Sequence, residues 1–228
     1  MKKSYTRKKW LYLLVIAVLT MLIACLLFVI MLTSGRSGYS VPVVENPNEV
    51  SPYLTHDLAP QFWDDVQKGG PFEIVVDEAG LNDIISRDST VSGGWPVSFD
   101  YVEVYTPTVK FLPDKINAVA KITLDGIKIY LDVNFKAEML SDGRMKVEID
   151  SVKAGFVDIT GFAISVIRDV FEKRFKGGSG EAGVDEIVYA ILENKPFEPV
   201  FAVGEQKLRI NKIDLSQSKL LVGFVPVN

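Results

Sequence analysis

The sequence predicts an α+β domain that follows one membrane-spanning helix. Three observations carry this prediction: an uncharged apolar run over 11–32, alternating apolar and polar residues over 116–135, and two later segments with helical spacing of apolar residues. Alternation with a period of two is typical of antiparallel strands that bury one face, and helices can cover that face. We therefore expect one domain with a long, mostly antiparallel sheet packed on two or three helices.

The apolar run over 11–32 predicts a transmembrane helix. Its 22 residues carry no charge, and as a helix they would reach about 33 Å, enough to cross a bilayer core of roughly 30 Å. Five basic residues precede the run within nine positions and only Arg36 follows it closely, so the positive-inside rule predicts a basic cytoplasmic N-terminus over 1–10. The rest of the chain is then extracytoplasmic, attached by a single-pass signal anchor.

Two other interpretations of this run stay open. A cleaved signal peptide is disfavoured because the run exceeds an ordinary h-region of about 7–15 residues and no A-x-A site follows it. The tetrapeptide Leu22-Ile23-Ala24-Cys25 resembles a bacterial lipoprotein processing site, at which Cys25 would be lipidated. Residues 26–32 remain fully apolar, whereas a mature lipoprotein normally begins with a polar tether. Each route leaves the domain tethered at the outer face of the membrane.

Residues 33–70 are predicted to be an extracytoplasmic linker. Glycines and serines open the segment, and four prolines between Pro42 and Pro60 keep it extended. A short amphipathic piece from Phe62 to Val66 is expected to dock on the domain or to rest at the membrane interface. The lone histidine, His56, is interpreted as a surface residue, since no second imidazole or nucleophile motif accompanies it.

The globular domain is predicted over 72–228. A short strand from Phe72 precedes a helix that Asp77 can begin, and a meander follows whose strands meet at Asp125-Gly126 and Asp142-Gly143. Its middle strand, from Ile127 to about residue 140, would be unusually long. Two amphipathic helices are expected over 162–175 and 184–192, and three strands over 197–203, 207–214 and 219–225.

The chemistry available to this chain is limited. One cysteine and one histidine exclude a disulfide framework, a Cys/His zinc site and a thiol–imidazole dyad. Six of the 25 basic residues lie within 1–36, which leaves 19 against 29 acidic residues in the remainder, so that the body repels nucleic acid. The G-x-G-x-x-G pattern of 178–183 follows a helix rather than a strand and is interpreted as a loop. We predict a non-enzyme without cofactor or metal.

A family resemblance rests on three stretches of the chain. They are Val76 to Ile85 (VDEAGLNDII), the long hairpins with Asp-Gly turns, and Val152 to Phe156 (VKAGF) leading into an apolar helix. The chain thereby resembles the YpmS-like family of bacterial membrane-anchored proteins and, more remotely, LmeA-like and AsmA-like lipid-binding domains with a tubular (TULIP-like) shape. The resemblance covers roughly 72–228. It implies a strongly curved sheet around helices, an apolar groove for acyl chains, the bacterial plasma membrane and no catalytic residue.

The favoured hypothesis is an envelope protein that binds or shuttles membrane lipid, with no nucleic-acid partner. The candidate groove residues from the sheet are Ile127, Ile129, Leu131, Val133 and Phe135, and those from the first later helix are Val166, Ile167, Val170 and Phe171. Candidate contacts to anionic headgroups are Lys173, Arg174 and Lys176. The alternatives are a non-enzymatic interaction module that scaffolds envelope proteins and, as a third possibility, a hydrolase built on two carboxylates.

Overall fold

The computed structural model describes residues 3–34, 39–87, 94–99, 102–175 and 184–227. Side chains are described from 18 onward in the first helix, up to 168 in the fourth and from 186 in the fifth. The helices are α1 (Lys3–Thr33), the π-helical η1 (Tyr53–Leu58), α2 (Ala59–Lys68), α3 (Glu78–Ile85), α4 (Thr160–Phe175) and α5 (Val184–Leu192). The early strands are β1 (Phe72–Asp77), β2 (Val97–Phe99), β3 (Val102–Val104), β4 (Thr108–Leu112) and β5 (Lys115–Leu124). The later strands are β6 (Ile127–Met139), β7 (Met145–Ala154), β8 (Val157–Asp158), β9 (Val200–Val203), β10 (Gln206–Ser216) and β11 (Lys219–Val227).

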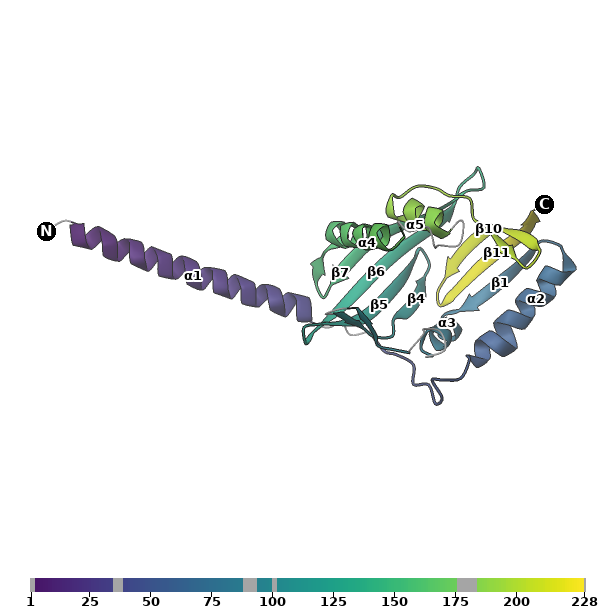
Figure 1. Cartoon of the computed structure of the whole chain (residues 1–228), viewed down its shortest axis with the longest axis horizontal. Coiled ribbons are helices and arrows are strands. Elements are labelled where there is room, and N and C mark those ends of the chain that lie inside the picture. Colours follow the sequence, from purple (N-terminus) through teal and green to yellow (C-terminus); the bar gives the residue numbers. More distant parts are fainter. Residues whose placement is uncertain (1–2, 35–38, 88–93, 100–101, 176–183, 228) are drawn as a thin grey trace.

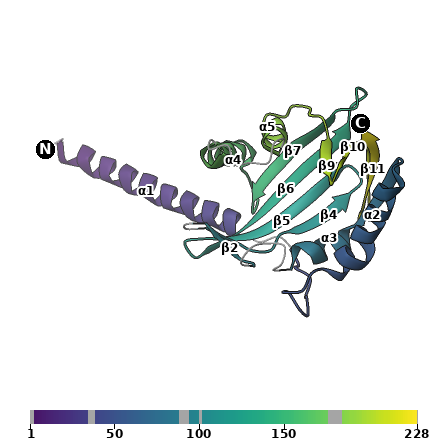
Figure 2. The ribbon, with the colours of Figure 1, turned by 45° about the vertical axis from the view of Figure 1, so that its right-hand side comes forward.

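The strands form two antiparallel sheets, which confirms the predicted α+β class. The larger sheet has the order β2-β3-β5-β6-β7-β8, with β4 also paired to β5, and the smaller one has the order β1-β11-β10-β9. In the smaller sheet the first strand of the domain pairs with the last, with Phe72 opposite Phe224. Figures 1 and 2 show α4 and α5 above the β7 side of the larger sheet, while α2 lies at the end of the domain opposite α1.

The helix α1 leaves one end of the domain as a separate rod (Figure 1). Its side chains from Val18 to Met31 are exposed. Within the part of the chain whose side chains the structure describes, no helix combines the length and the apolar character needed to cross a bilayer. The first seven residues of the predicted transmembrane segment, 11–17, lie outside that part.

The core forms where the two sheets meet. Phe111 on β4 and Leu208 on β10 are the largest fully buried side chains among the described residues, and β10 contacts both β4 and β6. The other buried apolar residues include Ile74 on β1 and Phe224 on β11. Long-range pairing of the C-terminal strands therefore closes the core that the meander begins.

The second half of the predicted linker is folded onto the domain. Phe62 on α2 meets the rings of Phe72 and Phe224 edge-on, with centroids 5.8 Å apart in both pairs. Val66, one turn further along α2, is buried. The amphipathic piece thus docks on the smaller sheet, because its aromatic face finds an aromatic partner there.

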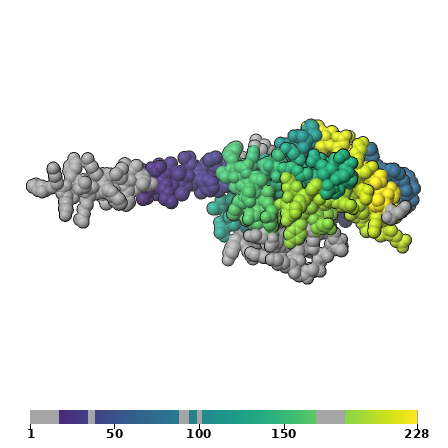
Figure 3. All heavy atoms as spheres, turned by 90° about the horizontal axis from the view of Figure 1, so that it is seen from above, coloured from purple at the N-terminus to yellow at the C-terminus, as the bar shows by residue number. Residues whose placement is uncertain are grey.

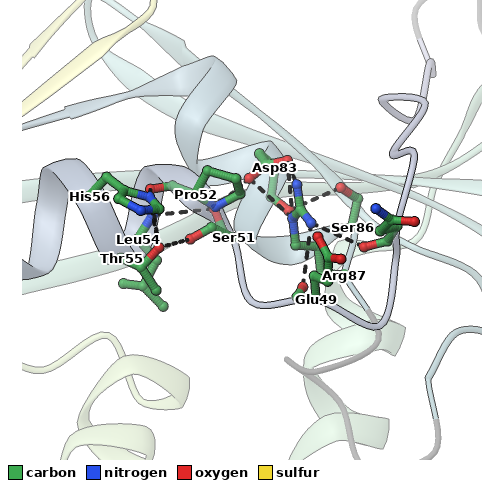
Figure 4. A network of polar contacts seen from close by, with 10 residues as sticks. Glu49, Ser51, Pro52, Leu54, Thr55, His56, Asp83, Ser86 and Arg87 are labelled. Carbon is green, nitrogen blue, oxygen red and sulfur yellow. Dashed lines mark hydrogen bonds and ion pairs between the residues drawn. The ribbon is translucent and has the colours of Figure 1, made fainter.

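A polar network ties the chain before η1 to α3 (Figure 4). The Arg87 guanidinium donates to both carboxylate oxygens of Asp83 and to the backbone carbonyl of Glu49, while the Ser51 hydroxyl donates to the same carboxylate. The hydrogen bonds from Arg87, and to a lesser extent that from Ser51, hold the pKa of Asp83 below its ordinary value. The network fixes the point at which the linker joins the domain.

Candidate functional site

The β5–β6–β7 part of the larger sheet has one apolar and one polar face. Across β5 and β6 the register places Ile122 opposite Ile129, Ala120 opposite Leu131 and Ala118 opposite Val133. Because side chains alternate along a strand, these residues share one face, and the intervening polar residues point to the other. We call Ile127, Ile129, Leu131, Val133 and Phe135 of β6 the apolar stripe. All five are sequence-predicted site residues, and β6 brings them onto one line.

The apolar stripe is incompletely buried along its whole length. Ile127 at its start is 47% exposed, and none of the four other members is fully buried. On the opposite face of the same sheet, by contrast, Val119 and Asp132 are buried. The strong alternation of the sequence predicts that the apolar face is the covered one. At the centre of β5 and β6, however, the buried positions lie on the polar face.

The position of the helices explains this partial cover. Both α4 and α5 contact β7, and the buried residues of β7, Val152 and Ala154, belong to the apolar face. At 16 and 9 residues, α4 and α5 are also short beside the 13 residues of β6, since a helix rises about 1.5 Å and a strand about 3.3 Å per residue. The two helices therefore cover the β7 side of the face more completely than the stripe.

The candidate groove residues on α4 are less well placed to line a groove than those on β6. Val166 and Ile167 are exposed, whereas Ala163 and Ile164 of the same helix are half-buried. Val170, Phe171, Lys173 and Arg174 lie on α4, but their side chains are outside the described residues, as is the whole of Lys176. The helical spacing identified α4 correctly, but its half-buried residues Ala163 and Ile164 are not among the candidate groove residues.

The opposite face carries a chain of polar side chains. Asn117 donates from Nδ2 to Asp132 Oδ1 (2.6 Å), and Asn134 donates from Nδ2 to the Ser151 hydroxyl (3.0 Å). Nearer to α1, the Tyr39 hydroxyl donates to the backbone carbonyl of Thr106 (2.7 Å), and burial raises the pKa of Tyr39. Side-chain hydrogen bonds therefore link β5, β6 and β7 on this face and stiffen the sheet behind the stripe.

A separate apolar cavity of about 310 Å³ lies between α2 and the smaller sheet. Leu54, Leu58, Phe62 and Trp63 line it from the helical side, and Ile74 and Phe224 line it from the sheet. Trp63 is partly exposed. The sequence does not predict this cavity, because 33–70 has the composition of a linker. The aromatic pair Phe62-Trp63 was the signal that could have indicated it.

The C-terminal end of α1 rests directly on the larger sheet. The Phe156 N–H donates to the Met31 carbonyl (3.1 Å), and the Gly155 N–H donates to the Tyr130 carbonyl of β6 (2.9 Å). Gly155 has a φ of +57°, and a Cβ there would lie 2.3 Å from the Met31 oxygen. Only glycine fits this close approach without strain. The stripe therefore begins beside the end of α1.

Comparison with known proteins gives no further guide to this site. No protein-family model matches the chain, and no curated protein matches it. Over the described ranges, no group of His, Cys, Asp and Glu side chains gathers in a way that could hold a metal ion. The arrangement that remains is an apolar surface of strand length, backed by a stiff polar face, that starts at the helix junction.

Proposed function

We propose that the chain is a single-pass membrane protein whose extracytoplasmic domain binds a lipid acyl chain along the apolar stripe. The observation that carries the proposal is the incomplete burial of the stripe from Ile127 to Phe135. Binding is favourable when an alkyl chain replaces water on such an apolar face, by roughly 0.8 kcal/mol for each methylene group buried. The uncharged run over 11–32 supports the membrane anchor.

The dimensions of the stripe agree with such a ligand. Ile127 and Phe135 are eight residues apart on one strand, which corresponds to about 27 Å. The stripe begins where α1 meets the domain, so an acyl chain leaving the membrane would meet Ile127 first. The resemblance to YpmS-like and TULIP-like proteins points to the same ligand class.

Photocrosslinking of the full chain in lipid membranes tests the proposal. Benzoylphenylalanine replaces Phe135 in one variant and Lys136 in a control, since these neighbours point to opposite faces of β6. We expect crosslinks to lipid from position 135 and not from 136. A position about 27 Å from the membrane-proximal Ile127 cannot reach the bilayer directly, so a crosslink there reports a bound lipid. Equal yields at both positions, or none at 135, would contradict lipid binding.

A second candidate function is an interaction module of an envelope complex. The apolar cavity beneath α2 favours it, because Trp63 is partly exposed beside an apolar space of about 310 Å³ at the end of the domain opposite α1. Such a space suits an apolar side chain of a protein partner. Benzoylphenylalanine at Trp63 should then crosslink to one envelope protein in cells. Crosslinks at 135 to lipid, with none to protein at 63, would favour the first function.

A further inference from the structure

We infer that the end of the domain beside α1 is a membrane-docking surface that inserts apolar side chains into the lipid interface. The surface consists of Leu124, Ile127, Phe156 and Phe162. This inference rests on the proposed membrane anchor. It shares Ile127 with the apolar stripe but otherwise concerns different residues and a different contact from acyl-chain binding. Its occupant is the surface of the same bilayer that holds α1.

The four side chains come from three segments and all are exposed. Leu124 and Ile127 face each other across the β5–β6 hairpin, Phe156 lies in the turn after β7, and Phe162 lies in the first turn of α4. Phe156 is 58% exposed and Phe162 is 71% exposed. Exposed aromatic residues of this size are costly in water and are typical of sites that contact a membrane or a partner.

Backbone hydrogen bonds hold these segments at the end of α1. The Phe156 N–H donates to the Met31 carbonyl, and the neighbouring Gly155 is bonded to Tyr130, three residues along β6 from Ile127. The Ile159 N–H donates to Val152 on β7, and the Ala163 N–H donates to Ile159, so the first turn of α4, which carries Phe162, is tied to β7 close to the turn that carries Phe156. In the space-filling view, the green surface of β7 and α4 adjoins the described part of α1 (Figure 3).

The end of α1 fixes the position of this surface along the bilayer normal. The apolar sequence of α1 continues to Leu32, and the hydroxyls of Thr33 and Ser34 donate to carbonyls of the last turn, at Val29 and Ile30. A spanning helix would leave the hydrocarbon where its apolar sequence stops. Because Phe156 is bonded to Met31 without a spacer, its side chain lies at the level of the membrane interface, where aromatic rings are favoured.

The charges around the surface indicate that apolar insertion, not anionic attraction, is the driving force. Lys128, next to Ile127, is exposed, but so are Asp125, next to Leu124, and Asp158, two residues after Phe156. Hydrogen bonds from Thr160 hold the pKa of Asp158 below its ordinary value, so this carboxylate stays charged at neutral pH. With both signs present, docking needs no anionic lipid. It should also depend little on salt.

A fluorescence experiment on the full chain tests the inference. The chain carries Cys25→Ser and one new cysteine, at Phe162 or at Leu124, labelled with an environment-sensitive dye. It is then placed in nanodiscs of phosphatidylcholine alone. Val75→Cys is the matched control, since this residue is 41% exposed on β1, away from α1. Lipids with a nitroxide near the headgroup should quench the label at 162 and 124 by roughly half and leave the label at 75 unchanged.

The outcomes separate this inference from the proposed function. Quenching at 162 and 124 that persists between about 0.05 and 0.5 M salt supports docking. If the chain enters nanodiscs but labels at 162 and 75 are quenched equally, the docking surface is refuted while the anchor and acyl binding stand. If the chain does not enter nanodiscs, the anchor fails and the inference fails with it. Lipid crosslinking at 135 is read independently.

Discussion

The Asn82 side chain on α3 takes the place of a neighbouring strand at the free edge of β4. Its Nδ2 donates to the Val109 carbonyl (2.7 Å), and its Oδ1 accepts from the Val109 N–H (2.7 Å), as a neighbouring strand would. Glu78 accepts from the Phe111 N–H on the same edge (2.8 Å). An unpaired strand edge is open to aggregation, and α3 protects this one.

Replacing Asn82 with leucine tests the value of this contact. Asn82→Leu keeps the volume but leaves two backbone groups of Val109 without a partner, so we expect a loss of about 2 to 4 kcal/mol in the free energy of unfolding. Urea denaturation measures it. Asn82→Asp keeps the acceptor and loses the donor, and should fall between leucine and the native residue. Leucine without measurable cost would show that β4 needs no such cap.

The pair of Arg87 and Asp83 predicts a pH-dependent contribution to stability. The folded pKa of Asp83 lies below its ordinary value of 3.8, so the pair stabilises the fold above that pH, and the stabilisation is lost as the pH falls through the folded pKa. Arg87→Gln should cost about 2 to 3 kcal/mol at pH 7. Below pH 3.8 the difference in the free energy of unfolding between the native chain and the variant should shrink. What remains is the contribution of the hydrogen bonds from Arg87 to backbone carbonyls, which the variant also lacks. A difference that stays constant to low pH would contradict it.

At the scale of elements, Gly155 joins α1 to the sheet. Gly155→Ala introduces a Cβ 2.3 Å from the Met31 carbonyl at a φ of +57°, so we expect the Phe156–Met31 hydrogen bond to break. Hydrogen exchange at the Phe156 amide should then become faster by about tenfold or more. Gly161→Ala is the control, because nothing lies within 4 Å of a Cβ there. Identical exchange in both variants would mean that the junction does not hold α1.

The sequence predicted local elements well and long-range partners poorly. Alternation located β6 over Ile127–Met139, and apolar spacing located α5 over Val184–Leu192, because both signals depend only on neighbouring residues. The pairing of β1 with β11 joins residues far apart in sequence, and no local pattern encodes it. The same is true of Asn82, whose role depends on β4. The stripe was named correctly as one face, but its partial burial depends on where α4 and α5 land.

At the scale of the whole molecule, an apolar rod leads to the end of the domain that we propose to dock on the membrane, and the stripe leads away from that end. Hydrogen bonds join Asn117, Asp132 and Asn134 on the polar face behind the stripe, so the sheet does not need the ligand to hold its shape. A lipid would therefore bind to a preformed surface, which lowers the entropic cost of binding.

The most direct test asks whether lipid reaches Phe135 along the stripe. The full chain carries benzoylphenylalanine at Phe135, with either Leu131→Asp on the stripe or Lys128→Asp on the opposite face as the control. A carboxylate beneath an alkyl chain is costly. We therefore expect Leu131→Asp to lower the lipid crosslink at 135 by about tenfold or more, and Lys128→Asp to leave it unchanged. Equal crosslinking in both variants would contradict a lipid path along β6.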